Sequence, residues 1–214
     1  MKRLSLAILL GALLSICGVN GGFHSVSPAN AQETVPETAP FGLKWGMSVA
    51  DVERLGVKLD PQGSPSESFG PSYLATNVPK VLKDIAGIIV SFDYNGRLWR
   101  VSAVSENFEN DAYGRAIRDR YQELGSLLND RYGKGQEVNG APSDDFFSQS
   151  NNFVYSLYRQ ERQLFTDWRI TNTAIQLSVR AAGTSSAYYH LIYEYTPFKA
   201  DVTKKAKQRE KDAL

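Results

Sequence analysis

Cysteine, histidine and methionine are scarce in this chain, and neither sign of charge is in excess. Its 214 residues include one cysteine, two histidines and two methionines, and the formal net charge is +1. A single cysteine cannot form a disulfide within the chain, and a structural zinc site needs about four Cys or His ligands, more than are present. The near-neutral charge also excludes the basic composition that is typical of nucleic-acid-binding domains.

The apolar run near the N-terminus is too short to span a membrane as a helix. It covers residues 4–19, about 16 residues, whereas a spanning helix needs about 20, and it follows Lys2 and Arg3. Two cations before a short apolar stretch are typical of a secretory signal peptide. The polar segment that follows ends with small residues at Ala29 and Ala31, so we predict cleavage after Ala31 and a bacterial periplasmic protein.

Two alternatives to a cleaved signal peptide remain open at this point. The segment could stay in place as an N-terminal anchor, or Cys17 could be lipidated. Lipoprotein signals place Gly, Ala or Ser before the cysteine, whereas Ile16 stands there, and lipidation would leave the alanines at positions 29 and 31 without a purpose. We therefore favour cleavage, with no stable membrane span in the mature protein.

Cleavage of the signal peptide would remove most of the reactive side chains. Cys17 and His24 would be lost, so the mature chain would have no thiol and one imidazole, His190. Removal of Lys2 and Arg3 from the 24 cations leaves 22 against 23 anions. Cysteine catalysis is then excluded, and a serine triad could use only His190, in a sequence without the G-x-S-x-G pattern of nucleophile elbows.

The mature chain divides into three parts. Residues 32–40 are polar and predict a flexible leader. Residues 41–197 contain the periodic segments and predict a single domain. Residues 198–214 are highly charged with little apolar periodicity, which predicts a tail that is a frayed helix or disordered.

A helix-capping motif opens the predicted domain. Ser48 precedes an apolar-periodic segment and Asp51 follows it by three residues, which is the pattern of a capping box. Gly56 is a suitable stop. The short helix would bury residues at helical spacing, namely Val49, Val52 and Leu55.

The segment around this motif, residues 42–56, resembles a known opening of small exported bacterial proteins. It reads Trp-Gly-Met-Ser, then Asp-Val, then Leu-Gly, and is also similar to the helix start of the SmpA-class outer-membrane-assembly lipoproteins. Those proteins share an architecture with β-lactamase inhibitor proteins, in which helices pack against an antiparallel sheet. The resemblance implies a binding or accessory protein without catalysis.

The pair Asn95-Gly96 predicts a β-hairpin, because both residues tolerate the positive φ angles of a type I′ turn. A two-residue loop would place Phe92 opposite Trp99 and separate an apolar face from a mostly polar one. The apolar face would hold Ile88, Val90, Phe92, Trp99, Val101 and Ala103. The opposite face would hold Ile89, Ser91, Asp93, Leu98, Arg100 and Ser102.

Residues 110–132 predict a long amphipathic helix that ends before Gly133, followed by a loop at 133–143. The apolar stripe of this helix would contain Tyr113, Ile117, Tyr121, Leu124, Leu128 and Tyr132. Beyond the loop, strands are predicted at 153–158, 164–170, 175–181 and 187–195, although residues 144–163 could contain some helix. Helices segregated from antiparallel strands predict an α+β fold, with one short and one long helix packed against the sheet. A helix followed by a meander occurs twice, so a diverged duplication is one interpretation.

The last predicted strand presents the candidate interaction surface. Its more polar face carries Tyr188, His190, Ile192 and Glu194. An uncovered face of this composition is typical of protein contacts. The alternative is that the long helix or the tail covers it.

We therefore expect a periplasmic, non-catalytic protein that binds another macromolecule, as an envelope accessory factor, an inhibitor or an immunity protein. No catalytic residue, cofactor or metal ligand is predicted. A carboxylate-dependent cell-wall glycan hydrolase is one alternative, and its candidate acids are Asp93, Asp144, Asp145 and Glu194. The other alternative is a small-molecule carrier with a cavity between the sheet and the long helix.

Overall fold

The computed structural model describes residues 38–62, 70–212 and 214. The predicted signal peptide, its cleavage site and most of the predicted leader lie outside these residues. Within the described ranges, no helix combines the length and the apolar character that crossing a membrane requires. In chain order the elements are η1 (Pro40–Gly42), α1 (Val49–Arg54), β1 (Lys58–Pro61), β2 (Ser72–Thr76), β3 (Ile85–Phe92), β4 (Leu98–Ser105), α2 (Arg115–Tyr132), β5 (Gln136–Gly140), α3 (Asp145–Ser148), η2 (Ser150–Asn152), α4 (Phe153–Tyr158), β6 (Gln163–Ile170), β7 (Thr173–Ala181), β8 (Ala187–Tyr195) and α5 (Thr196–Asp212).

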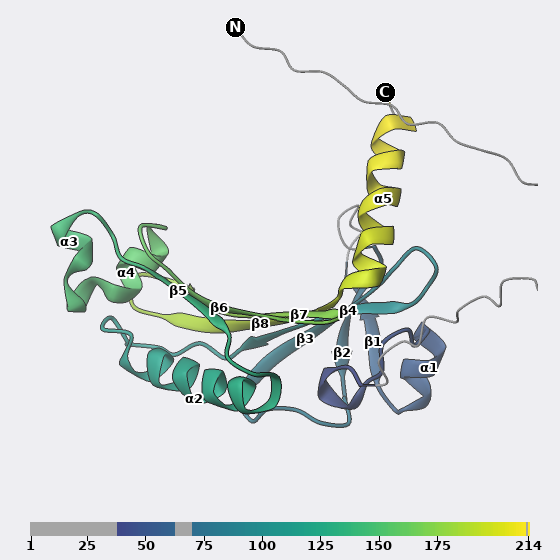
Figure 1. Cartoon of the computed structure of the whole chain (residues 1–214). Helices are drawn as coiled ribbons and strands as arrows, with labels where there is room; N and C mark the ends of the chain where they lie inside the picture. The colour runs from purple at the N-terminus through teal and green to yellow at the C-terminus, as the bar shows by residue number, and fades with distance from the viewer. Residues whose placement is uncertain (1–37, 63–69, 213) are drawn as a thin grey trace, which may run out of the picture. The chain divides into compact units, whose positions relative to one another are not determined.

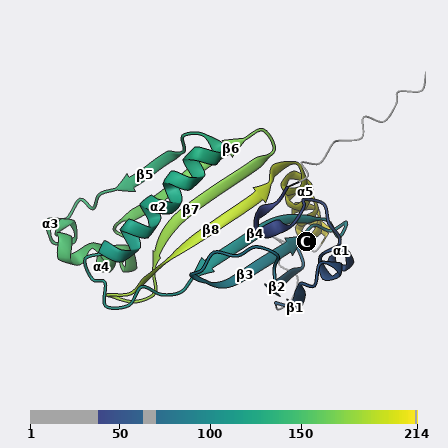
Figure 2. The same ribbon diagram turned by 90° about the horizontal axis from the view of Figure 1, so that it is seen from below.

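The strands form one eight-stranded antiparallel sheet in the order β1-β2-β3-β4-β8-β7-β6-β5 (Figure 2). Two meanders, β1 to β4 and β5 to β8, meet in its middle, where Val101 of β4 lies opposite Tyr193 of β8. The predicted α+β class is thereby confirmed. Each meander follows a helix, α1 or α2, which is the order that the duplication hypothesis requires.

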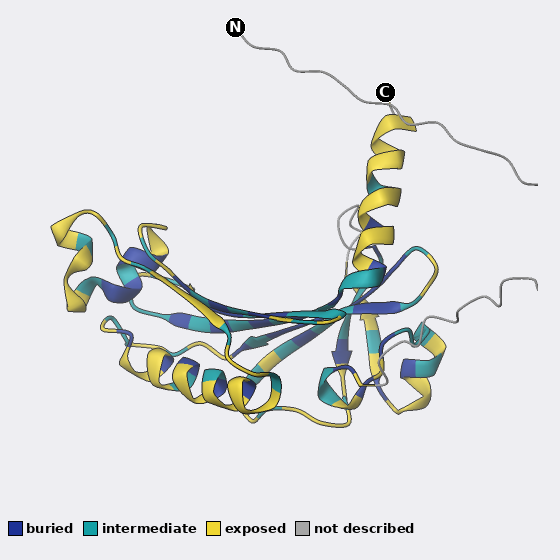
Figure 3. Ribbon diagram, viewed as in Figure 1, coloured by how far each residue is buried: buried dark blue, intermediate teal, exposed yellow. Residues whose placement is uncertain are grey.

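The long helix α2 covers one face of the sheet, and α5 rises from the opposite side near β4 (Figure 1). The Tyr121 and Thr166 hydroxyls lie 2.5 Å apart, and the Trp168 indole N–H donates to Asn129 Oδ1 over 3.0 Å, so α2 is held on β6. The buried side of α2 is visible in Figure 3 and consists of Ile117, Tyr121, Leu124 and Leu128. Burying each such side chain contributes roughly 1.5–3 kcal/mol.

The predicted capping box of α1 is confirmed. Ser48 Oγ accepts the Asp51 N–H over 3.2 Å, and Asp51 Oδ2 accepts the Ser48 N–H over 2.9 Å. Gly56, with φ at +86°, follows the helix. Val52 is fully buried, but Leu55 of the predicted stripe is 44% exposed. Because the helix has only six residues, its last turn ends before Leu55 can reach the core.

The turn between β3 and β4 is not the predicted type I′ turn. Gly96 has a positive φ of +75°, but Asn95 does not, and three residues separate Asp93 from Arg97, whose carbonyl accepts the Asp93 N–H over 2.8 Å. The Asp93 carboxylate accepts the N–H groups of Asn95 and Arg97 over 2.9 and 2.8 Å. These bonds favour a three-residue loop with a glycine bulge over the two-residue loop.

The longer loop changes the strand register beside the turn. Phe92 pairs with Leu98 instead of Trp99, whereas Val90 still pairs with Val101 as predicted, because a bulge absorbs the difference. Both Leu98 and Trp99 are buried. The predicted polar face is also less exposed than its composition suggests, since four of its members are buried: Ser91, Asp93, Leu98 and Ser102.

The long helix begins at Arg115 rather than at the predicted residue 110. The Asp111 carboxylate accepts the N–H groups of Arg115 and Ile117 over 2.7 and 3.0 Å, and so caps the first turn from outside the helix. Gly114 stands between them in the left-handed conformation. Tyr113, predicted in the buried stripe, therefore precedes the helix and is 47% exposed.

Replacement of Gly114 by alanine is expected to lower the free energy of unfolding by about 2 kcal/mol. The residue has φ at +64°, which disfavours a Cβ, and that Cβ would lie 2.1 Å from Cδ1 of Phe153, a buried ring. Urea denaturation measures the loss. Gly96→Ala is the matched control, because φ there is +75° but nothing lies within 4 Å of the added Cβ. Equal losses in the two variants would contradict the steric part of the argument.

Two further segments differ from the predicted secondary structure. Residues 153–158, predicted as a strand with some helix left open over 144–163, form α4. Phe153, Val154 and Leu157 bury one helical face, while Tyr158 is 52% exposed. In a short apolar run, periodicity does not distinguish a strand from a buried helix. The predicted loop at 133–143 contains β5, which pairs along β6 as an edge strand with mostly exposed side chains.

Both ends of the described domain are packed. Ala39, within the predicted leader, is 8% exposed, and its N–H donates to the Leu43 carbonyl over 2.9 Å. The tail, which the sequence predicts to be either a frayed helix or disordered, forms α5. Phe198 and Val202 in its first turns are buried, and the Phe198 ring lies edge-on to Tyr195 with centroids 4.7 Å apart. The first two turns of α5 therefore belong to the core.

Candidate site on the open face of the sheet

The face of the sheet turned away from α2 is called here the open face. Strand alternation and register place on it, from β4, β8, β7 and β6, the residues Arg100, Ser102, Val104, Tyr188, His190, Ile192, Glu194, Ala174, Gln176, Ser178, Arg180, Phe165, Asp167 and Arg169. The four predicted surface residues are among them, and each is half-buried. The alternative that the long helix covers this face is wrong, because α2 packs on the other face. The tail contacts one end of it, where Lys199 pairs with Glu194.

The open face carries two adjoining hollows, one beside α4 and one beside α5. Figure 1 shows these two helices toward opposite ends of strands β6 to β8. The α4 hollow has a volume of about 510 Å³ and lies between α4 and strands β6, β7 and β8. The α5 hollow has a similar volume, about 510 Å³, and includes Lys199 of α5. Gln176 lines both hollows, so they form one concave stretch along strands β6, β7 and β8.

Charged groups on the open face are arranged unevenly. Glu194 accepts from Arg100 Nε over 3.3 Å and also pairs with Lys199. Asp167 Oδ1 accepts from Gln176 Nε2 over 2.9 Å. Both acids line the α5 hollow, so the carboxylates of the open face lie toward α5 and are already hydrogen-bonded.

His190 forms a hydrogen bond that sequence reasoning missed. Its Nε2 lies 2.6 Å from Ser102 Oγ. Burial, together with the nearby Arg100 and Arg180 guanidinium groups, lowers the pKa of His190 to about 4. The imidazole is therefore neutral at pH 7. The sequence carries no local sign of this pair, because 88 residues separate its members and only the pairing of β4 with β8 brings them together.

The Ser102–His190 pair does not have the geometry of a serine nucleophile with its base. Ser102 is 3% exposed, whereas a nucleophilic hydroxyl must be reachable by substrate. Within the described residues, His190 has no hydrogen bond to a carboxylate that could orient its ring, which a triad requires. The pair instead stabilises the contact between the two meanders.

The four candidate acids of the hydrolase alternative are not gathered into one site. Asp144 caps α3, where its Oδ1 accepts the Phe146 N–H over 2.7 Å, and Asp145 is in the first turn of the same helix. Asp93 is 2% exposed in the β3–β4 turn. Glu194 lies between two cations on the open face. Each acid except Asp145 thus holds a hydrogen bond or ion pair within the fold.

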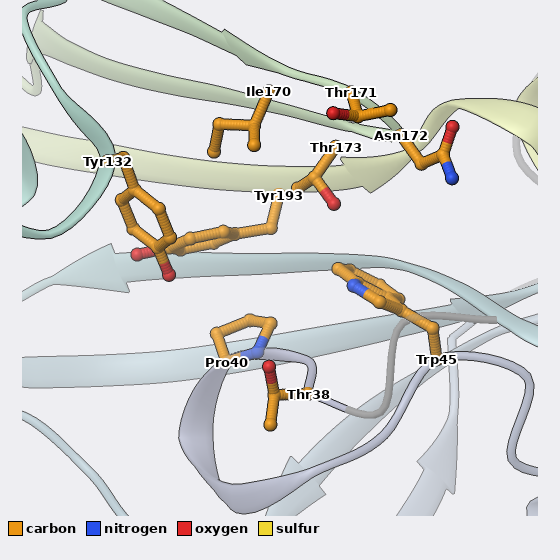
Figure 4. A pocket seen from close by; sticks show the side chains of 9 residues that line it. All are labelled: Thr38, Pro40, Trp45, Tyr132, Ile170, Thr171, Asn172, Thr173 and Tyr193. Carbon is orange, nitrogen blue, oxygen red and sulfur yellow. The ribbon is translucent and has the colours of Figure 1, made fainter. Parts of the chain in front are cut away.

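A separate cavity lies between the sheet and the C-terminal end of α2, where the carrier alternative expects one. Figure 4 shows Trp45, Tyr132 and Tyr193 around it, and its volume is about 260 Å³. The described residues that line it include no Asp, Glu, Lys or Arg. Pockets for drug-sized molecules usually measure about 300–1,000 Å³, so this cavity suits only a small uncharged ligand.

Metal-ligating side chains are not clustered in the described part of the chain. No group of three or more His, Cys, Asp or Glu residues there could hold an ion. The chain matches no known protein family, no curated protein sequence and no solved structure.

Proposed function

We propose that the protein is an exported, non-catalytic component of the bacterial envelope that binds a partner protein on its open face. The observation that carries the proposal is the concave stretch between α4 and α5, which no helix among the described residues covers. Its two hollows of about 510 Å³ each adjoin at Gln176. Each hollow alone has the volume of a small-molecule pocket, about 300–1,000 Å³. The two adjoin along strands β6, β7 and β8, however, and this extended shape suits a segment of a protein.

The composition of the stretch supports a protein partner. Protein interfaces combine aromatic and apolar anchors with arginine and a polar rim. Tyr188, Phe165 and Ile192 supply the half-buried apolar surface here, and Arg180 and Arg169 stand exposed beside them. The export signal and the resemblance of residues 42–56 to envelope proteins favour a partner in the same compartment.

The alternatives have weaker support. The hydrolase requires two cooperating acids, and Asp144, Asp93 and Glu194 hold structural contacts in different parts of the fold. The carrier requires a ligand small enough for the cavity beside Trp45. Neither uses the larger concave surface, so we place binding of a protein first.

Photocrosslinking in the native periplasm tests the proposal. A photoreactive phenylalanine analogue at Tyr188, on the open face, is expected to give one reproducible protein adduct, identified by mass spectrometry. The same analogue at Leu127, 56% exposed on α2, is the matched control and is expected to give at least about tenfold less of that adduct.

A second variant separates specific docking from adventitious capture. Ile192→Asp places a charge in the middle of the open face and is expected to abolish the Tyr188 adduct, whereas Leu127→Asp leaves it unchanged. Equal adduct from both crosslinking positions, or an adduct that survives Ile192→Asp in a folded protein, would overturn the proposal.

A further inference from the structure

Among the described residues, the lining of the α4 hollow is positively charged and holds no acid. Its lining includes Arg162 and Arg180 but neither Asp nor Glu. Around these two cations stand uncharged polar groups and aromatic rings, namely Tyr158, Gln160, Gln163, Phe165, Ser178 and Tyr188. The α5 hollow differs, because Asp167 and Glu194 line it together with its cations.

Neither arginine of the α4 hollow has its charge balanced within the described residues. Arg162 Nε donates to Ser156 Oγ over 3.0 Å, a neutral acceptor, and no ion pair involves Arg162 or Arg180 in that part of the chain. A third cation, Arg118, adds to the field, since it stacks 4.9 Å from the Phe153 ring that Arg162 also contacts at 5.1 Å.

The pKa of Arg162 reflects both its burial and the positive charge around it. Burial and then the charge of Arg118 lower the pKa of Arg162. Most buried or half-buried cations in proteins are paired, because an unpaired charge with reduced hydration is unfavourable. Arg162 is half-buried and lines the hollow, and within the described residues Nε is the guanidinium nitrogen that has a hydrogen-bond partner. Such a guanidinium is a site for an anion, and carboxylates bind guanidinium groups in two-point contacts.

We propose that the α4 hollow binds adjacent acidic side chains of the partner protein, with Arg162 and Arg180 as the carboxylate-binding residues. This inference rests on the proposed function, because it names the chemistry of the partner segment that occupies one end of the open face. The surrounding tyrosine and phenylalanine rings would contact apolar residues beside those acids. Charge complementarity of this kind sets partner choice and speeds association.

A fluorescence anisotropy titration with the full-length mature protein tests the inference. The probe is a fluorescein-labelled peptide with paired Asp and Glu residues flanked by Leu and Phe, and its Asn/Gln counterpart is the reference. We expect the acidic peptide to bind at least tenfold more tightly than the reference at 50 mM NaCl, and a rise to 300 mM NaCl to weaken it.

Charge-matched variants locate the binding. Arg162→Gln/Arg180→Gln is expected to weaken acidic-peptide binding at least tenfold, while Arg115→Gln/Arg131→Gln, which removes the same charge from exposed positions of α2, changes it less than twofold. Arg180→Gln alone, at an exposed position, serves if the double variant does not fold. Binding unchanged by the hollow variants, or equally weakened by the α2 variants, would overturn the inference.

Two further measurements identify other outcomes. Inorganic phosphate and vesicles with anionic lipid are added as competitors of the labelled peptide. If the vesicles displace the labelled peptide and an unlabelled Glu-rich peptide does not, a protein partner is rejected. If the Tyr188 adduct forms normally with Arg162→Gln/Arg180→Gln, the proposed function stands and the acidic-segment inference fails. If no adduct forms with the wild type, the proposed function itself fails.

Discussion

Asp84→Ala is expected to lower the free energy of unfolding by about 3 kcal/mol, because it removes the centre of a network that joins three elements. Asp84 lies in the connection before β3. Arg120 of α2 donates to its two carboxylate oxygens over 2.7 and 2.8 Å, and the Tyr189 hydroxyl of β8 donates to Oδ1 over 2.8 Å. The alanine variant leaves Arg120 and Tyr189 without their acceptor.

Limited exposure makes this network costly to break. The Arg120 and Asp84 side chains are 11% and 18% exposed, so water replaces the lost contacts only in part. Burial raises the pKa of Asp84, but the hydrogen bonds from Arg120 and Tyr189 outweigh it and the net pKa is lowered. A lowered carboxyl pKa means that this stability is present above the ordinary pKa of 3.8 and is lost as the pH falls below it.

Glu123→Gln is the matched control for Asp84→Ala. Glu123 pairs with the same Arg120 guanidinium at 2.7 Å, but it is 59% exposed. We expect a loss below about 0.5 kcal/mol from this variant. Urea denaturation at pH 7 measures both losses, and a loss from Asp84→Ala no larger than that from Glu123→Gln would refute the network argument.

The second large effect is a fall in stability between pH 6.5 and pH 4 that depends on His190. The pKa of this residue is about 4 in the folded protein, below its ordinary value of 6.5. The unfolded chain therefore binds a proton in this range before the folded protein does, so stability is fully present above pH 6.5 and decreases as the pH is lowered. The difference of the two pKa values corresponds to at most about 3 kcal/mol.

His190→Gln is expected to remove this part of the pH dependence. Glutamine keeps a polar group beside Ser102 Oγ but does not titrate. Urea denaturation at pH 7.5 and pH 4.5 should show a loss about 2 kcal/mol smaller in the variant than in the wild type. Ser102→Ala serves as the control, since it removes the hydrogen bond and keeps the imidazole. Identical pH dependence in the wild type and His190→Gln would contradict the assignment.

Two predictions rested on patterns that are complete within a few residues. The capping box at Ser48 and Asp51 needs only a helix start, and its two hydrogen bonds form as predicted. The alternation along residues 187–195 likewise assigned each side chain of β8 to its face. Because a strand has a period of two, the alternation separates the faces whatever the neighbouring strands are.

Other predictions failed where two local signals competed. Asn95-Gly96 favours a type I′ turn, but the Asp93 carboxylate accepts two backbone N–H groups and favours the longer loop. The apolar run 153–158 suits either a strand or a buried helix, and contact with the chain near Gly114 selects the helix, since the Val154 N–H donates to the Ala112 carbonyl over 3.2 Å. A side chain within the turn decided the first case, and a tertiary contact decided the second.

The sequence by itself determined the α+β class, the start of the first helix, the two faces of β8 and the small inventory of reactive side chains, because each follows from composition or from spacing along one element. Only the tertiary structure decided the pairing of β4 with β8, the Ser102–His190 bond, the packing of α5 and the position of two arginines at the α4 hollow. Those features join residues far apart in the chain, and the free energy that selects them comes from burial and pairing across elements, for which a single sequence carries no local signal.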